Sequence, residues 1–191
     1  MNPLGLAAAF SVGVVILVVT FLVLAIYNAV VALELRIDKA WANIDVALKQ
    51  RFDQLPNLVE AVRDVLTWER ELLTEVTRLR AEYAPGEPIS RQAVTSEATT
   101  AAVRQLLAVA EGYPVLQSNR NVLDLQDEIE RLEGVIADRR ELYNDQVYRY
   151  NARIAQVPAL FLAPIFGWCE RPFFAASPAE TARPDTSLAG G

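Results

Sequence analysis

The sequence predicts an all-α protein in which one N-terminal transmembrane helix precedes an antiparallel bundle of long helices. Three observations support this fold class. The first 33 residues carry no Asp, Glu, Lys, Arg or His and are mostly apolar. Farther along, apolar residues recur at alternating steps of four and three, which is typical of helices that pack along a seam. Strand alternation and the paired turn residues of hairpins are missing from the sequence.

The N-terminal helix is expected to span a bilayer. Residues 4–26, "LGLAAAFSVGVVILVVTFLVLAI", would form a helix about 35 Å long, enough to cross a hydrocarbon core of about 30 Å. A cleaved signal peptide would need a basic n-region and a shorter apolar run, and no basic residue precedes Arg36. The residues assigned to the anchor are Leu4, Ile16, Leu22, Ile26 and Tyr27, the last at the depth of the membrane interface.

Two further expectations concern the anchor. Arg36 and Lys39 follow the span and no Lys or Arg precedes it, so the positive-inside rule favours a short exterior N-terminus and a cytoplasmic body. Gly5, Ala9 and Gly13 repeat at four-residue spacing, a pattern that lets membrane helices approach closely and self-associate. The alternative is that small residues are simply common in membrane helices.

Breaks in the pattern divide the chain into an anchor (1–27), a helical bundle (28–157), and an apolar segment with a disordered tail (158–191). Within the bundle we expect helical regions at 28–83, 90–111 and 118–157, separated by "APGEP" and "EGYP". Pro56 lies inside the first region. It either kinks one long helix, which we favour because no turn residues precede it, or opens a second helix after a tight reversal.

Composition excludes several functional classes. The chain has 18 basic and 24 acidic residues and a net charge of -6, which argues against a phosphate-neutralising surface for nucleic acid. It has one cysteine and no histidine, so it lacks an intramolecular disulfide and the commonest catalytic base and metal ligand. We expect no catalytic activity and no cofactor. The alternative is a metal-dependent enzyme using the carboxylates of Glu130 and Glu133, three residues apart.

Two sets of residues are candidates for packing or partner contacts. Tyr-Asn pairs occur three times, at the membrane boundary and twice, seven residues apart, on one face of the last helix. They predict a polar layer, or else tyrosines in the core with asparagines facing solvent. The residues of this layer are Asn28, Tyr143, Asn144, Tyr150 and Asn151.

The second set is the apolar run "ALFLAPIFGW", residues 159–168, which is too short to cross a bilayer. Four alternating helices would return it to the membrane interface, whereas three would leave it at the far tip as a protein contact. It could also fold back onto the bundle as core. The residues of this segment are Leu160, Phe161, Ile165, Phe166 and Trp168.

Three blocks resemble the LemA family in order and spacing. They are "YNAVVALELRIDKAWANIDVALKQRFDQLPNLVEAV", "AVAEGYPVLQSN" with "LQDEIERLE", and "RRELYNDQVYRYNARIAQVPALFLAPIFGW". The resemblance covers about residues 1–175 and departs at Val157, where the family usually has phenylalanine. It implies a bacterial helical bundle on a single-pass anchor with no established catalytic activity.

The sequence therefore predicts a membrane-anchored scaffold or interaction protein whose partners are the lipid bilayer, further copies of itself and other membrane proteins. A membrane-shaping homo-oligomer is the alternative within the same class.

Overall fold

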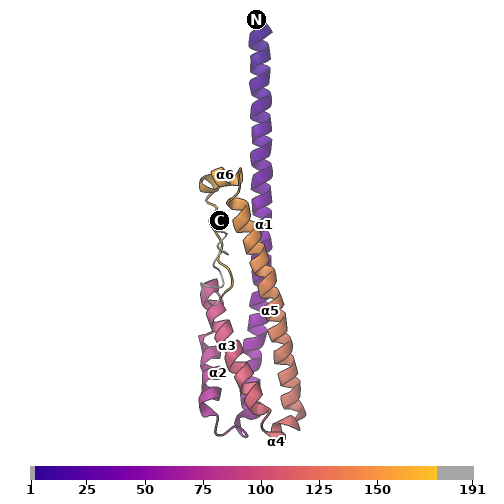
Figure 1. Ribbon diagram of the computed structural model, residues 1–191, viewed down its shortest axis with the longest axis vertical. Helices are drawn as coiled ribbons and strands as arrows, with labels where there is room; N and C mark the ends of the chain where they lie inside the picture. The colour runs from indigo at the N-terminus through magenta and orange to yellow at the C-terminus, as the bar shows by residue number, and fades with distance from the viewer. Residues whose placement is uncertain (1–2, 176–191) are drawn as a thin grey trace, which may run out of the picture. The chain divides into compact units, whose positions relative to one another are not determined.

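The computed structural model describes residues 3–175, and within them the chain is helical apart from its connections and the segment 167–175 that follows the last helix (Figure 1). The all-α prediction is therefore confirmed. The helices are α1 (Pro3–Arg63), α2 (Arg70–Glu82), α3 (Ile89–Ala110), α4 (Pro114–Gln117), α5 (Arg120–Ile154) and α6 (Ala159–Phe166). The expected disordered tail from residue 176 onward lies outside the described residues.

The chain forms two compact units, and the two longest helices contribute to both. Unit 1 comprises Met1–Lys39 and Gln146–Arg171, and unit 2 comprises Ala40–Asp145 together with Pro172–Gly191. The beginning of α1 and the end of α5 thus belong to unit 1. The end of α1, the short helices α2 to α4 and most of α5 belong to unit 2.

Unit 2 is an antiparallel helical bundle around an apolar core. Asn43 and Arg51 of α1 bond to Arg139 and Glu133 of α5, so residue numbers rise along one helix as they fall along the other. α2 and α3 lie side by side in the same bundle (Figure 1). The buried core residues include Ile44, Leu48, Leu55, Leu58 and Val62 from α1, Val76 and Leu79 from α2, Val103 and Leu106 from α3, and Ile129 and Leu132 from α5.

Pro56 lies inside α1, exposed on its surface, and the helix continues through it to Arg63. The missing amide of residue 56 costs α1 one hydrogen bond to the carbonyl of residue 52, and the buried seam on either side maintains the helix. The reversal that we considered at Pro56 occurs about two helical turns later, over residues 64–69.

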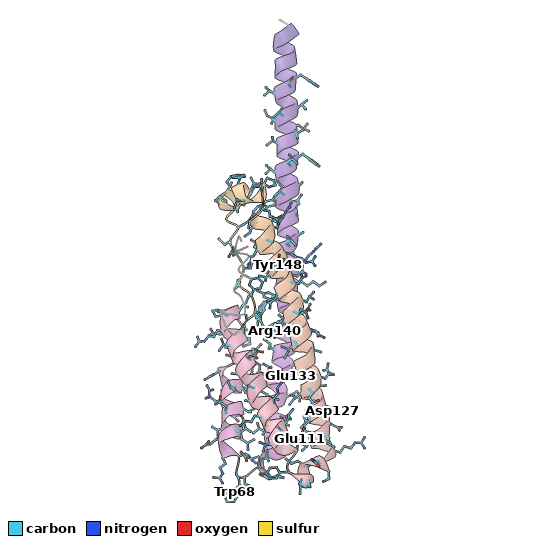
Figure 2. All side chains as sticks on the ribbon, in the orientation of Figure 1. Trp68, Glu111, Asp127, Glu133, Arg140 and Tyr148 are labelled. Carbon is cyan, nitrogen blue, oxygen red and sulfur yellow. The ribbon has the colours of Figure 1, made fainter. Side chains whose placement is uncertain are left out.

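The expectation of one helix over residues 28–83 is therefore wrong. The chain leaves α1 where the amides of Val65 and Leu66 both donate to the Val62 carbonyl, and Leu66 is fully buried. The segment has neither glycine nor proline, and tertiary packing overrides its local tendency because reversal buries α2 against its neighbours. Trp68 stands at this turn with 90% of its surface exposed (Figure 2).

A buried guanidinium joins three helices of unit 2. Arg51 of α1 is fully buried, and its Nη1 donates to Glu133 Oε1 of α5 at 2.8 Å and to Thr100 Oγ1 of α3 at 2.9 Å. Its Nη2 donates to Ser96 Oγ at 3.1 Å, and Thr100 Oγ1 donates to the second Glu133 oxygen at 2.6 Å. Glu133 is labelled on α5 in Figure 2. We call this network the Arg51 centre.

The buried charge of Arg51 requires partners that replace the water it has lost. Burial lowers the pKa of the Arg51 guanidinium, and the adjacent Glu133 carboxylate opposes that shift. A charge removed from water must be compensated by partners in good geometry, and here a carboxylate and two hydroxyls provide them. Removing only one member of the ion pair leaves the other charge in a poorly solvated position.

We expect Arg51→Met to destabilise the protein by about 3 kcal/mol, because it strips Glu133 of its counter-charge. For a chain of this size that corresponds to a fall of roughly 6 to 12 °C in Tm, measured by circular dichroism in mild detergent. The double variant Arg51→Met with Glu133→Leu should recover part of the loss. The control is Arg131→Met, which breaks the exposed Arg131–Glu128 ion pair on α5 and should leave Tm unchanged. Equal effects of the two arginine variants would contradict this account.

Candidate membrane-contacting site

The first part of α1 presents unpacked apolar side chains. Phe10, Leu17 and Phe21 are 76%, 70% and 68% exposed, and Ile16 and Leu22 are exposed as well. By length and composition α1 could cross a membrane, and only 11% of its most apolar 18-residue stretch is buried. A core helix of a soluble protein would be mostly buried. The prediction of one long apolar N-terminal helix is confirmed.

Packing in unit 1 begins where this apolar stretch ends. Ile26 is the first buried side chain of α1 in the part whose side chains are described, and Val30 follows one turn later. Between them the Tyr27 ring contacts Phe166 at a centroid distance of 5.1 Å and Trp168 at 6.2 Å. Phe166 and Trp168 also stack on each other at 5.1 Å. These three rings, which we call the aromatic cluster, join α1 to the end of α6.

α6 packs through small residues and leaves its large ones outside. Ala159 and Ala163, four residues apart, are its buried face, whereas Leu160, Phe161 and Ile165 are 48%, 67% and 73% exposed. The helix ends at Gly167, whose φ of 70° lies in the left-handed region, and the Trp168 amide donates to the Ala163 carbonyl at 2.9 Å. The small residues let one face of α6 approach its neighbours closely. The large apolar side chains lie on the opposite face, which points away from the protein.

Charged groups lie just beyond the aromatic cluster in unit 1. Glu34 accepts a hydrogen bond from Tyr150 of α5 at 3.2 Å, and Arg171 lies 4.0 Å from Glu34 and 3.7 Å from Asp38. Burial, together with the nearby Glu34 carboxylate, raises the pKa of Tyr150 to about 12. The tyrosine therefore stays a neutral donor across the physiological pH range.

The asparagines of α5 bind the backbone of an extended segment, residues 171–174, which we call the C-terminal strap. In unit 1, Asn151 Nδ2 donates to the Arg171 carbonyl at 3.0 Å, and the Arg171 amide donates to Asn151 Oδ1 at 2.9 Å. In unit 2, Asn144 makes the same reciprocal pair with Phe174, at 3.2 and 2.8 Å. Each asparagine side chain thus bonds both the backbone amide and the backbone carbonyl of one strap residue.

The tyrosines beside these asparagines are buried. Tyr143 donates through its hydroxyl to the Pro172 carbonyl at 2.9 Å, and its ring packs against Trp41 at 5.8 Å. Phe174 is also buried and lies 5.9 Å from Trp41. Tyr143, Asn144 and Asn151 of α5 therefore bind the strap, whereas Tyr150 bonds to Glu34. Asn28 is exposed on α1.

The other candidate residues are placed as follows. Gly13 is open, since a Cβ there would meet nothing within 4 Å, and the side chains of Leu4, Gly5 and Ala9 lie outside the described part. Glu133, one of the two candidate metal ligands, is bound by Arg51 and Thr100 instead. Among the described residues no cluster of three or more His, Cys, Asp or Glu side chains could hold a metal ion.

Sequence reasoning missed Arg51 and the strap. Arg51 occupies a helical seam position between Leu48 and Leu55, and a charge at such a position is itself a signal of a buried ion pair. Residues 171–174 follow the apolar segment without periodicity, so nothing in their own pattern indicated a binding partner.

We expect Asn144→Asp to release the strap, because the carboxylate cannot donate to the Phe174 carbonyl and repels it. Cleavage by chymotrypsin after Phe173 or Phe174, followed by mass spectrometry, should accelerate roughly tenfold. Asn57→Asp on the surface of α1, where Asn57 bonds only to the neighbouring Gln54, is the matched control. An unchanged cleavage rate in Asn144→Asp would show that these bonds do not secure the strap.

Part of the chain is similar to curated proteins. Two curated proteins, Magnetosome protein MamQ 1 and Magnetosome protein MamQ 2 of Paramagnetospirillum magneticum, are each 36% identical to the chain over 78 residues. Each match covers 41% of this chain and 29% of the relative's length. The similarity is thus distant and restricted to part of each protein.

The family comparison is broader. The sequence pattern of the LemA family matches residues 40–188, which include the Arg51 centre, both strap-binding asparagines and α6. This range covers well over half of the chain and confirms the resemblance seen in the three sequence blocks. The chain belongs to the LemA family.

Proposed function

We propose that the chain is a membrane-anchored, non-catalytic helical scaffold that self-associates, with α1 as a single-pass anchor. The observation that carries the proposal is the change of environment along one uninterrupted helix. From Phe10 to Leu24 the side chains of α1 are mostly apolar and exposed, and from Ile26 onward one face of the same helix is buried by protein. A bilayer around the first part would cover the surface that protein leaves bare.

Charge distribution supports an orientation for this anchor. No Lys or Arg precedes the apolar stretch, and Arg36 and Lys39 follow it on the exposed side of α1. Basic residues close to a span are retained on the cytoplasmic side. We therefore place the N-terminus outside and the helical body that follows the anchor, from residue 28 onward, in the cytoplasm of a bacterial cell.

Self-association is proposed through the anchor. Gly13 sits on a part of α1 with no packed neighbour in the single chain, and a side chain added there would meet open space. Gly5 and Ala9 continue the same small-residue face along the helix. Small residues let two membrane helices approach closely enough for van der Waals packing, which drives their association in lipid.

The anchor is tested by membrane fractionation. We expect the full-length chain to resist extraction at high salt and alkaline pH, and the variant Ile16→Arg with Val19→Arg to shift toward the soluble fraction, because each arginine costs about 2.5 to 3.5 kcal/mol at a helix centre. Leu35→Arg, at an exposed apolar position beyond the stretch, is the control and should remain in the membrane. Release of the unaltered chain by salt alone would refute the anchor.

Self-association is tested by the mass of the detergent-extracted particle, using light scattering with electron microscopy of the same sample. We expect a homo-oligomer for the unaltered chain and a smaller mass for Gly13→Leu, because a bulky side chain separates the packed helices. The single-chain fold accommodates that side chain, so a loss of mass would report on association. Val14→Leu on another face is the control. A monomeric unaltered chain would refute self-association. Curved vesicles in electron micrographs of the same protein after reconstitution into lipid would favour the membrane-shaping alternative.

A further inference from the structure

We propose that α6 and Trp168 form a second membrane contact, in which the short helix lies in the lipid interface beside the point where α1 leaves the bilayer. The occupant of the exposed apolar face of α6 is lipid, at the boundary between headgroups and acyl chains. This inference rests on the proposed anchoring by α1. It adds a separate site, made by a segment more than 130 residues later in the sequence.

The aromatic cluster fixes the level of α6 along α1. Tyr27 is the first residue after the apolar stretch, and its ring touches both Phe166 and Trp168. If residues 4–26 occupy the hydrocarbon core, Tyr27 lies at its edge, where tyrosine and tryptophan rings are favoured. The contacts then place the end of α6 at the same edge.

The side chains of α6 suit the edge of the hydrocarbon core better than they suit water. No charged side chain occurs between Ile154 and Cys169, and the exposed residues Phe161 and Ile165 are among the largest apolar groups of the chain. The nearest charged residue on the N-terminal side is Arg153, whose positive charge favours anionic headgroups. On the C-terminal side the first charged residues are Glu170 and Arg171. An uncharged, apolar exposed surface is typical of a helix that lies in a membrane interface.

The dimensions of α6 also fit an interfacial position. Its eight residues measure about 12 Å along the axis, which is too short to span a bilayer. Figure 1 shows α6 lying across the direction of α1, so a bilayer crossed by α1 would have α6 along its surface. Burial of 5 to 10 Å into the interface is the depth typical of such helices.

The face that binds lipid is the one that protein leaves free. Ala159 and Ala163 face the protein, whereas Leu160, Phe161 and Ile165 face away. Continuity with the apolar surface of α1 selects lipid over a second protein copy, because the two surfaces meet at Tyr27 within unit 1. The same membrane that covers Leu24 would cover α6 without a further partner.

The test measures the environment of α6 in the full-length chain. The natural Cys169 is replaced by serine, and a nitroxide label is attached at Ile165→Cys or, as a matched control, at Tyr148→Cys. Both positions are well exposed, at 73% and 64%, but Tyr148 lies on α5 away from α6 (Figure 2). The protein is reconstituted into vesicles of phosphatidylcholine and phosphatidylglycerol, and the accessibility of each label to oxygen and to a water-soluble nickel chelate is recorded.

We expect the label at position 165 to be more accessible to oxygen and the label at position 148 to be more accessible to nickel. High nickel accessibility at position 165, in protein that still floats with vesicles, would overturn the α6 contact while leaving the anchor intact. Low accessibility to both reagents would mean that protein covers α6, which also overturns the proposal. Failure of the unlabelled chain to float would refute the anchor, and with it the lipid contact of α6.

A second measurement uses the natural tryptophan. Lipids brominated near the headgroup should quench part of the fluorescence of the unaltered chain, and Trp168→Phe should abolish that part of the quenching. Trp68, 90% exposed at the α1–α2 turn, provides the comparison, since Trp68→Phe should leave the quenching in place. Quenching that survives Trp168→Phe would contradict the proposed depth.

Discussion

The burial of the Arg51 guanidinium is the interaction on which the arrangement of unit 2 depends. A charge without water must be held by fixed partners, and α3 and α5 provide these partners from positions 45 to 82 residues farther along the sequence. An apolar seam tolerates sliding by a turn, because one leucine replaces another at similar free energy. A guanidinium bonded to one carboxylate and two hydroxyls does not tolerate such a shift, because it would lose its partners. The Arg51 centre therefore selects one helix register among those that the apolar seams alone would permit.

The aromatic packing beside this centre extends the same constraint. Phe52, the next residue of α1, stacks on Tyr83 at a centroid distance of 4.1 Å, and Tyr83 donates to Asp45 at 3.1 Å. Burial and the Asp45 carboxylate raise the pKa of Tyr83, so its hydroxyl remains a donor. The connection that follows α2 is thereby tied to α1, and the reversal over residues 64–69 is secured from its far end.

Much of the fold could be predicted from the sequence because it depends on patterns along single helices. The apolar stretch of α1, the seam of α5 and the breaks at "APGEP" and "EGYP" each carry their own local signal. The turn after Arg63 has a weaker local signal in the sequence. The seam steps from Leu66 to Leu72, six residues rather than three or four, and only packing against the rest of the bundle turns that irregularity into a reversal. The partners of Asn144 and Asn151 lie some 20 to 30 residues away in a segment without periodicity, so spacing alone could not identify them.

The pairing of the strap with asparagine side chains has a consequence for solubility. An extended segment normally displays unpaired amides and carbonyls, which can recruit a strand from another molecule and start aggregation. An asparagine amide presents the same donor and acceptor as a peptide group, so each asparagine imitates one residue of a neighbouring strand. At Arg171 and Phe174 both backbone groups are occupied in this way. The helical protein thus pairs the backbone groups of two residues of an extended segment without making a sheet, and it does so beside an apolar segment where intermolecular strand pairing would be most damaging.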